Sequence, residues 1–335
     1  MNSKVPVVWL TESDVTELVT LNDAIDALEV QLRQLGSKRA FNVPKALASY
    51  GEGASMHSLG SCSLESGYAG FKNWVFTRAG ASALFAMFDA ADGSLVAVIE
   101  AAALGQLRTS AISGLATRWL AAPNADTLAL VGTGSQALTQ AIAVALVRNL
   151  RRIQVYGRSP EKRAAFVRRL AAEVPCEVIE STSVQAATEG ADIVTLVTRA
   201  QEPFLSSRML SLGAHLNAVG AILPANAEFE QDVFERASVL VVDDLDGVQK
   251  NSREFITRFG ARGDWSTVET LGHLISQGKK RPVIAPLTVF KAMGMGISDL
   301  AIAVLALERS RERGTGNHIA KAQRSALRWE LPEHV

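Results

Sequence analysis

The chain has 335 residues, of which 48% are hydrophobic and 20% charged, and this composition excludes a disordered or fibrous protein. Its length is sufficient for two domains or for one large α/β unit. The 34 Lys and Arg residues equal the 34 Asp and Glu residues in number, whereas proteins that bind duplex nucleic acid usually carry a basic excess, so we expect no nucleic-acid partner.

The first 120 residues predict a mixture of helices and short strands. Thr11-Glu-Ser-Asp14 is similar to a helix-capping box, and the spacing of apolar residues predicts an amphipathic helix from about Asn22 to Leu35. Asp92-Gly93 predicts a tight turn between two apolar runs. An Ala-rich helix is expected at about 103–121, after an antiparallel sheet whose extended segments are 45–50, 56–64, 68–76, 82–89 and 95–100.

After Pro123 the pattern changes to short apolar strands that alternate with helices, which is typical of a parallel, doubly wound sheet. The expected strands are 127–131, 153–156, 176–179, 192–197, 215–219 and 239–242. A last helix is expected at about 297–311, after a glycine-rich turn. We therefore predict an α/β protein in which residues 124–300 form one domain, and residues 1–123 together with 301–335 form the other.

The sharpest local motif is the segment from Leu128 to Ala137, which contains G-x-G-x-x-A directly between a strand and a helix. The first glycine, Gly132, permits a tight turn, and Gly134 allows the backbone to approach a pyrophosphate. The small Ala137 lets the helix pack closely on the sheet. The motif predicts a dinucleotide site; the alternative is a tight strand–helix turn without a ligand.

The end of the second strand of this unit discriminates between cofactors. NAD-binding folds place a carboxylate there to accept from the ribose 2′-hydroxyl. This chain instead continues from Tyr156 into Gly157-Arg158-Ser159, where Arg158 and Ser159 could receive a 2′-phosphate. The segment favours NADP over NAD, which remains possible. The alternative is that Arg158 is a solvated loop residue.

Five segments in the right order and at matching spacing are similar to the ornithine cyclodeaminase/mu-crystallin family. They are Gly70–Lys72, Leu107–Ala111, Val131–Ala137, His215–Ala221 and Phe290–Gly294. The resemblance, which is to the ketimine reductase-like branch, implies a homodimer with a Rossmann domain and an α+β domain for substrate binding and dimerisation. Because the family includes cyclodeaminases, cyclic imine reductases, alanine dehydrogenases, opine-type synthases and non-catalytic ligand binders, it specifies the fold better than the reaction.

Two residues are the candidate catalytic groups. Lys72 lies among apolar residues of a predicted strand, where its side chain could simply reach solvent; the resemblance implies instead that it faces the substrate. Arg108 lies in an almost uncharged helix, and burial of an unpaired guanidinium costs several kcal/mol, so it requires an anionic partner. That partner is either an internal carboxylate such as Glu100 or, as the resemblance implies, the substrate carboxylate.

The resemblance also suggests Lys45 as a second carboxylate contact, Met56 as a substrate-binding residue and Thr109 as a neighbour of the substrate or the cofactor phosphate. His57, next to Met56, is either a proton carrier or structural. We expect the cofactor to be bound by Thr109, Gly132, Gly134, Ser135, Gln136, Ala137, Arg158, Ser159, Thr198, Val219, Gly220 and Gly294.

One position departs from the family pattern. Cyclodeaminases that resemble this chain carry an aspartate after the Ala-Val-Gly-Ala stretch, where this chain has Ile222. Isoleucine neither takes up a proton nor binds an ammonium group, so the substitution favours a substrate with one carboxylate and an apolar or cyclic remainder. We interpret Lys291 and Asp299 as structural or cofactor-positioning residues. No cluster of His, Cys, Asp or Glu has convincing metal spacing, and we expect no metal.

These observations predict an NADPH-dependent reductase of cyclic imino acids such as Δ1-pyrroline-2-carboxylate or Δ1-piperideine-2-carboxylate. The alternatives are a cyclodeaminase that releases ammonia and recycles NAD, an amino-acid or opine-type dehydrogenase, and an NADPH-binding protein without turnover. No apolar run reaches the ~18 residues of a membrane span, and the N-terminal segment does not have the pattern of a secretory signal. Cys62 and Cys176 lie far apart, and we expect a cytoplasmic protein without disulfides.

Overall fold

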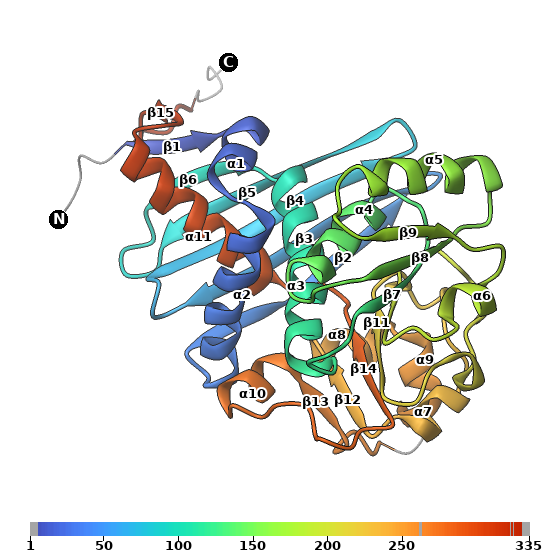
Figure 1. The fold of residues 1–335 in the computed structure, drawn as a ribbon. Coiled ribbons are helices and arrows are strands. Elements are labelled where there is room, and N and C mark those ends of the chain that lie inside the picture. The colour runs from blue at the N-terminus through green and yellow to red at the C-terminus, as the bar shows by residue number, and fades with distance from the viewer. Residues whose placement is uncertain (1–5, 261–262, 322, 324, 330–335) are drawn as a thin grey trace.

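Two β-sheets organise the chain in the computed structural model, which describes residues 6–260, 263–321, 323 and 325–329 (Figure 1). One sheet is mixed and carries four helices on one face; the other is parallel and has helices on both sides. The α/β class and the two-part architecture predicted from the sequence are confirmed. The expected division at 123/124 and 300/301 stays a prediction. Its second position falls inside α11, and parts of its terminal segments lie outside the described residues.

The mixed sheet has seven strands in the order β15-β1-β6-β5-β4-β3-β2. Strands β2 to β6 pair antiparallel with their neighbours, as predicted, while β1 pairs parallel with β6 and antiparallel with β15. Asp92-Gly93 forms the expected turn, with a φ of +71° at Gly93. The strands are β1 (Val7–Leu10), β2 (Ala40–Tyr50), β3 (Ala54–Ser63), β4 (Tyr68–Thr77), β5 (Gly80–Asp89), β6 (Leu95–Glu100) and β15 (Asn317–Ile319).

One face of this sheet is covered by α1 (Glu12–Leu18), α2 (Leu21–Gly36), α3 (Ala102–Leu120) and α11 (Gly296–Arg313). The predicted capping box at Thr11 is present, and Thr20 caps α2 in the same way. Leucines and isoleucines from these helices pack with Phe85, Met87 and Ile99 of the sheet in one buried cluster. This apolar layer fixes the helices on the sheet.

Helix α3 is held at both ends by charged side chains. Both carboxylate oxygens of Glu12 accept hydrogen bonds from backbone N–H groups of its first turn, at 2.7 and 2.6 Å. At the other end, Arg148 donates to carbonyl oxygens of the last turn, and Arg281 donates to that of Leu120. The signs of these charges complement the helix dipole. Arg148 and Arg281 belong to the parallel-sheet part of the chain, so α3 links the two sheets.

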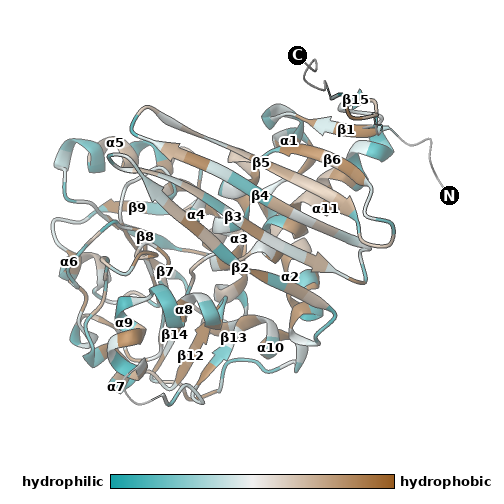
Figure 2. Ribbon diagram, turned by 180° about the vertical axis from the view of Figure 1, so that it is seen from behind, coloured by the Kyte–Doolittle hydropathy of each residue, from teal (hydrophilic) through white to brown (hydrophobic). Residues whose placement is uncertain are grey.

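The opposite face of strands β2 to β5 is free of helices, and in Figure 2 these strands lie in front of α2, α3 and α11. Large apolar side chains on this face are between 39% and 50% exposed. We call this set the outer apolar face: Phe41, Val43, Met56, Phe71, Val75 and Leu84. An uncovered apolar face of this kind marks an interaction surface.

The parallel sheet has eight strands in the order β13-β12-β14-β11-β10-β7-β8-β9. The chain moves outward from β7 to β9 and then returns to β10 on the other side of β7, which creates a switch point between β7 and β10. All six predicted strands are confirmed. The strands are β7 (Thr127–Val131), β8 (Arg152–Tyr156), β9 (Glu177–Glu180), β10 (Ile193–Leu196), β11 (Ala214–Ala218), β12 (Val239–Val242), β13 (Val268–Thr270) and β14 (Leu287–Lys291).

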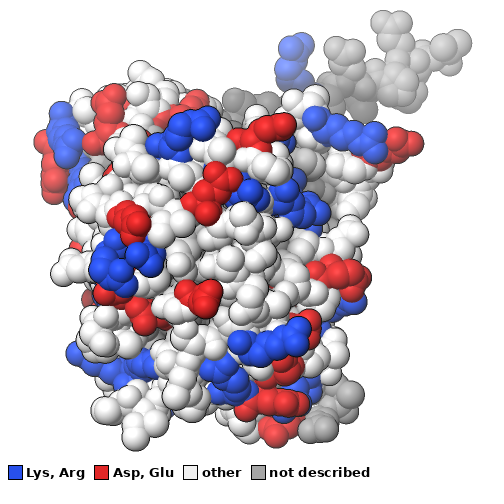
Figure 3. Space-filling model, turned by 45° about the vertical axis from the view of Figure 1, so that its right-hand side comes forward, with Lys and Arg blue, Asp and Glu red and all other residues white. Residues whose placement is uncertain are grey.

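Short helices connect these strands. Those following the first two strands are α4 (Ala137–Ala145) and α5 (Pro160–Ala171). The others are α6 (Val184–Thr188), η1 (Ser207–Met209), α7 (Asp232–Arg236), α8 (Leu245–Asn251), α9 (Arg253–Phe255), η2 (Ile256–Gly260) and α10 (Leu271–Ser276). None of the helices in the described part of the chain is long and apolar enough to cross a membrane. On the surface that Figure 3 shows, basic and acidic side chains lie interspersed, consistent with the balanced charge of the sequence.

Candidate active site

The glycine-rich turn between β7 and α4 has the geometry of a phosphate-binding loop. Gly132 has a φ of +123°, and a Cβ there would lie 2.6 Å from the carbonyl oxygen of Val197, so only glycine fits. At Gly134 nothing lies within 4 Å of the site a Cβ would occupy, which leaves the backbone open above the start of α4. Ser135 is exposed beside it, and Ala137 is buried against the sheet. These residues fit a dinucleotide pyrophosphate at a helix N-terminus.

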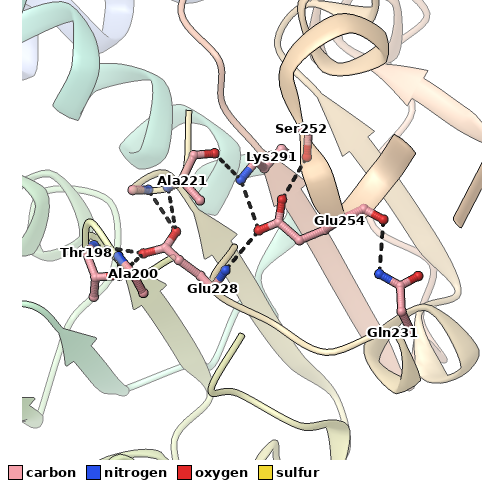
Figure 4. Close-up of polar contacts among 9 residues, drawn as sticks. Thr198, Ala200, Ala221, Glu228, Gln231, Ser252, Glu254 and Lys291 are labelled. Carbon is pink, nitrogen blue, oxygen red and sulfur yellow. Dashed lines mark hydrogen bonds and ion pairs between the residues drawn. The ribbon is translucent and has the colours of Figure 1, made fainter. Parts of the chain in front are cut away.

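One buried carboxylate, that of Glu228, binds the backbone at the carboxyl ends of both β10 and β11 (Figure 4). The Glu228 side chain accepts from the backbone N–H and the hydroxyl of Thr198, both at 2.8 Å. It also accepts from the N–H groups of Gly220 at 2.9 Å and Ala221 at 3.0 Å. Glu228 thus fixes the backbone at two of the expected cofactor residues, Thr198 and Gly220, and at the neighbouring Ala221.

A second carboxylate continues this network. Glu254 accepts from the Glu228 backbone N–H at 3.0 Å and from the Ser252 hydroxyl at 2.9 Å. Lys291, at the end of β14, donates to the carbonyl oxygen of Ala221 at 2.7 Å and lies 3.5 Å from Glu254. All three charged side chains are fully buried, and every polar atom of theirs has a partner. Lys291 therefore has the structural role expected from the sequence.

The end of β8 carries the residues expected to distinguish NADP from NAD. Arg158 is exposed in the loop that leaves the sheet. The Ser159 hydroxyl caps α5 by accepting from the Lys162 N–H at 3.4 Å. Arg163 lies behind them, pairing with Glu180 at 2.8 Å and donating to the carbonyl oxygen of Gly157. The exposed guanidinium of Arg158 is therefore the cation available to a ligand at this strand end.

Helices α3 and α11 bring two charged groups onto Lys72 of β4. The Lys72 ammonium lies 2.6 Å from Oδ1 of Asp299, and Arg108 Nε lies 3.5 Å from the same oxygen. Lys72 is 3% exposed and Asp299 is fully buried. Burial and the neighbouring Arg108 lower the pKa of Lys72 to about 8, although Asp299 opposes this shift. The ammonium is therefore close to its titration range at neutral pH.

Two polar atoms of this cluster are buried without a hydrogen-bond partner among the described residues: Nε of Arg108 and Oδ2 of Asp299. The terminal nitrogens of Arg108 lie over Gly294, where a Cβ would be 2.7 Å from the nearer of them. Asp243 anchors this backbone by accepting from the N–H groups of Met293 and Gly294. The expected partner Glu100 is not near Arg108; it accepts instead from Trp9 and from the N–H of Glu12.

A third cation and two rings complete the wall of the site. Lys45 lies 5.8 Å and Lys72 5.1 Å from the centre of the Trp74 ring, and His57 stacks on Trp74 with 4.4 Å between ring centres. Burial and Arg108 lower the pKa of Lys45. With Lys45, Lys72 and Arg108 close together, an anionic ligand is favoured electrostatically.

Two expected site residues lie elsewhere. Met56 pairs with Val75 in the sheet, whereas Lys72 and Trp74 lie on the other face. Met56 is therefore on the outer apolar face, and its neighbour His57 reaches the site instead. Thr109 lies on α3, but its hydroxyl donates to the carbonyl oxygen of Gly105 at 2.7 Å, within the helix.

A pocket opens beside this cluster, between β2 and the carboxyl ends of β11, β12 and β14. Its wall includes Pro44, Lys45, Ile222, Asp244, Met293 and Gly294. Ile222 is 38% exposed there, so the position that departs from the cyclodeaminase pattern does contact the cavity. In the described part of the chain no group of three or more His, Cys, Asp or Glu side chains could hold a metal ion.

Sequence reasoning missed the central place of Asp299. It interpreted this residue as structural or cofactor-positioning, whereas the structure pairs it with both candidate catalytic cations. One signal was available: Lys72 and Arg108 each lie in an apolar segment, so each requires a nearby anion, and Asp299 is the acidic residue within an equally apolar stretch.

Comparison with known proteins agrees with this architecture. A Δ1-pyrroline-2-carboxylate reductase of Bacillus cereus is 33% identical over 230 residues, which cover 68% of this chain and 70% of that protein. The ketimine reductase mu-crystallin of Rattus norvegicus is 34% identical over 238 residues, covering 71% and 72%. The structure of Thermococcus litoralis Δ1-pyrroline-2-carboxylate reductase, in complex with NADH and L-proline, superposes with a TM-score of 0.87 at 26% identity, covering 93% of this chain and 100% of that one.

The similarity is not confined to the glycine-rich turn. The sequence profile of the ornithine cyclodeaminase/mu-crystallin family matches residues 6–314, which include both sheets apart from strand β15, the cluster around Lys72 and the helix that carries Asp299. The two-sheet fold, the buried cluster between the sheets and the continuous match lead to one assignment: this chain belongs to the ornithine cyclodeaminase/mu-crystallin family.

Proposed function

We propose that this protein is an NAD(P)H-dependent reductase of cyclic imino acids, of the Δ1-pyrroline-2-carboxylate or Δ1-piperideine-2-carboxylate type. The observation that carries the proposal is the cluster of Lys72, Arg108 and Asp299, which is buried and retains two polar atoms without partners. It lies beside the carboxyl edge of the parallel sheet. The names of the Bacillus cereus and Rattus norvegicus relatives and the proline complex of the Thermococcus litoralis enzyme support this reaction.

A dinucleotide fits along the edge formed by Gly132, Gly134, Ser135, Gln136 and Ala137 and the ends of β10 and β11. A reduced nicotinamide bound there would supply the hydride for the imine carbon. Arg158 favours NADPH, because its exposed guanidinium is free to pair with a 2′-phosphate.

Arg108 binds the substrate carboxylate. Its terminal nitrogens are directed toward Gly294, and the described residues give them no hydrogen-bond acceptor. A guanidinium matches a carboxylate with two parallel hydrogen bonds. Lys45 adds a second positive charge at the mouth of the same pocket.

Lys72 supplies the proton. As the imine carbon is reduced, the C=N π electrons pass to nitrogen, which takes a proton from the Lys72 ammonium; the lysine then regains a proton from solvent. With a pKa of about 8, Lys72 is mostly protonated at neutral pH yet releases its proton more readily than an ordinary lysine.

The pocket wall formed by Ile222, Pro44 and Met293 suits an uncharged ring. Ile222 itself offers no hydrogen bond to a second amino group, although Asp244 and Asp246 line another part of the pocket. The apolar residue at position 222, where the resembling cyclodeaminases carry an aspartate, favours reduction of a cyclic imino acid over cyclodeamination of a diamino acid.

The experiment that tests the proposal follows the loss of NADPH and NADH absorbance with Δ1-pyrroline-2-carboxylate, Δ1-piperideine-2-carboxylate and pyruvate with and without ammonia. Ornithine is assayed in parallel for release of ammonia. Consumption of NADPH with a cyclic imine is the expected result. Ammonia release from ornithine, without cofactor consumption by any imine, would overturn the proposal and show that another residue replaces the aspartate absent at Ile222.

We also propose that the protein is a homodimer that buries the outer apolar face. Six large apolar side chains there are 39–50% exposed, and covering them with a second copy removes apolar area from water. Replacement of Val75 by glutamate on this face would place a charge in the interface. We expect the wild type to sediment as a dimer and the V75E variant as a monomer; a wild-type monomer would contradict this proposal.

A further inference from the structure

Asp299 makes contacts that an ordinary buried salt bridge does not. It lies in the first turn of α11, and its Oδ1 is 2.6 Å from the Lys72 ammonium and 3.5 Å from Arg108 Nε. One oxygen of one carboxylate therefore contacts a residue of β4 and a residue of α3. Its other oxygen, Oδ2, is buried and has no partner among the described residues.

We propose that Asp299 is a positioning residue that holds the proton donor Lys72 and the carboxylate-binding Arg108 in fixed positions relative to each other. A substrate whose carboxylate is bound by Arg108 then has its imine nitrogen beside Lys72. The inference rests on the proposed reductase function and assigns Asp299 a role in it that acts through Lys72 and Arg108.

The contact with Asp299 also orients the guanidinium of Arg108. The Nε atom is the part of the guanidinium paired with Asp299, while the two terminal nitrogens lie over the backbone of Gly294. Gly294 has a φ of +87°, and a Cβ at this position would lie 2.7 Å from one of these nitrogens. The absence of a side chain at Gly294 thus leaves room for the fork that Asp299 orients.

Lys72 depends on Asp299 because its other charged neighbours are cations. Arg108 on α3 and Lys45 on β2 both act to remove its proton, and the Trp74 ring lies 5.1 Å away on its own strand. His57 of β3 stacks on that ring, and burial lowers its pKa, so at neutral pH it adds no charge to the cluster. Asp299 is the carboxylate in contact with the ammonium, and its negative charge helps Lys72 to keep the proton that reduction consumes.

The test compares Asp299→Asn with Asp23→Asn. The second variant is a matched control. Asp23 on α2 pairs with Arg309 on α11 at 2.7 Å, so D23N also removes an aspartate–cation pair that involves α11, but one far from Lys72. Protein labelled with ¹³C at the lysine Cε is titrated by NMR without any ligand, and the Lys72→Arg variant identifies the Lys72 resonance. We expect Lys72 to titrate about one pH unit lower or more in D299N, and unchanged in D23N.

Turnover gives the second readout. If Asp299 positions both cations, D299N moves the alkaline limb of kcat to lower pH by the same shift and raises KM for the imine. The Asp299→Glu variant retains the charge, so it should keep the Lys72 titration near the wild-type value while KM rises; it also serves if D299N does not fold.

An unchanged Lys72 titration in D299N would overturn the inference, as would loss of activity without any change in KM or pH profile. The two proposals fail separately. If the wild-type protein reduces no imine, the reductase function is wrong, whereas the ligand-free titration still decides whether Asp299 controls Lys72.

Discussion

Two buried clusters of charge, each with carboxylate and lysine side chains, differ in one respect. In the cluster of Glu228, Glu254 and Lys291, every polar side-chain atom has a partner. In the cluster of Lys72, Arg108 and Asp299, two buried atoms have none among the described residues. Burial alone does not distinguish them, since all but Arg108 are at most 3% exposed.

The difference indicates what each cluster does. A satisfied network stabilises a backbone conformation, and Glu228 uses its four hydrogen bonds to fix the ends of β10 and β11. An incompletely satisfied network carries a desolvation cost that a bound ligand removes. The number of unpaired atoms, more than the number of charges, therefore separates the candidate catalytic cluster from the structural one.

The largest effect that would sharpen this comparison is expected from Lys72→Met. Removal of a general acid lowers kcat by about 10²–10⁴-fold. In the wild type, activity should fall as the pH rises through about 8, because the reaction requires the protonated form of a lysine whose pKa is lowered to that value. In K72M this alkaline limb should disappear. A K72M enzyme with the wild-type limb would assign the titration to another group.

Glu228→Ala probes the satisfied cluster. It leaves four buried donors without their acceptor, and each unsatisfied buried donor costs about 1–3 kcal/mol of unfolding free energy. Chemical denaturation measures this loss. We expect kcat of the enzyme that remains folded to fall far less than in K72M. A stable E228A protein with abolished turnover would break the comparison, because it would place Glu228 among the reacting groups.

Arg108→Lys tests the fork with the charge retained. Lysine lacks the paired donors of a guanidinium, so kcat/KM for the imine should fall about 10- to 100-fold, chiefly through KM. The thermal midpoint should change little, since Arg108 donates no hydrogen bond to the described residues through Nε. An unchanged KM would mean that Arg108 does not bind the carboxylate.

The smallest effect is expected outside both clusters, at Arg158. R158A should lower kcat/KM for NADPH about tenfold and leave that for NADH unchanged, because the exposed guanidinium pairs only with the 2′-phosphate. Steady-state kinetics with both cofactors provide the ratio. Equal losses for NADPH and NADH would contradict this role.

Local pattern was sufficient for most of the fold. The strands at 127–131, 153–156 and 239–242 and the turn at Asp92-Gly93 follow from runs and spacings of a few residues. The glycine-rich loop was predictable because its short motif lies directly between a strand and a helix, although the close approach of Val197 to Gly132 involves a residue outside the motif.

The charged site was only partly predictable. Lys72 and Asp299 are 227 positions apart, and no local pattern specifies which cation a distant carboxylate will meet. Met56 was misplaced because the face on which a strand residue lies depends on pairing register, and one step along β3 exchanges Met56 for His57. The hydroxyl of Thr109 found an acceptor within its own helix, as threonine commonly does.

Helix α3 has a consequence for how the site admits its ligand. Glu12 binds the first turn of α3, and Arg148 and Arg281 bind its last turn, so the helix is a connection of fixed length between the two sheets. Arg108 lies along this helix, while Lys72 and Asp299 lie on the mixed-sheet side of it. Swinging the two halves apart requires release of one end of α3. The hydrogen bonds at the two ends of α3 therefore oppose any change in the separation of the two sheets around the site.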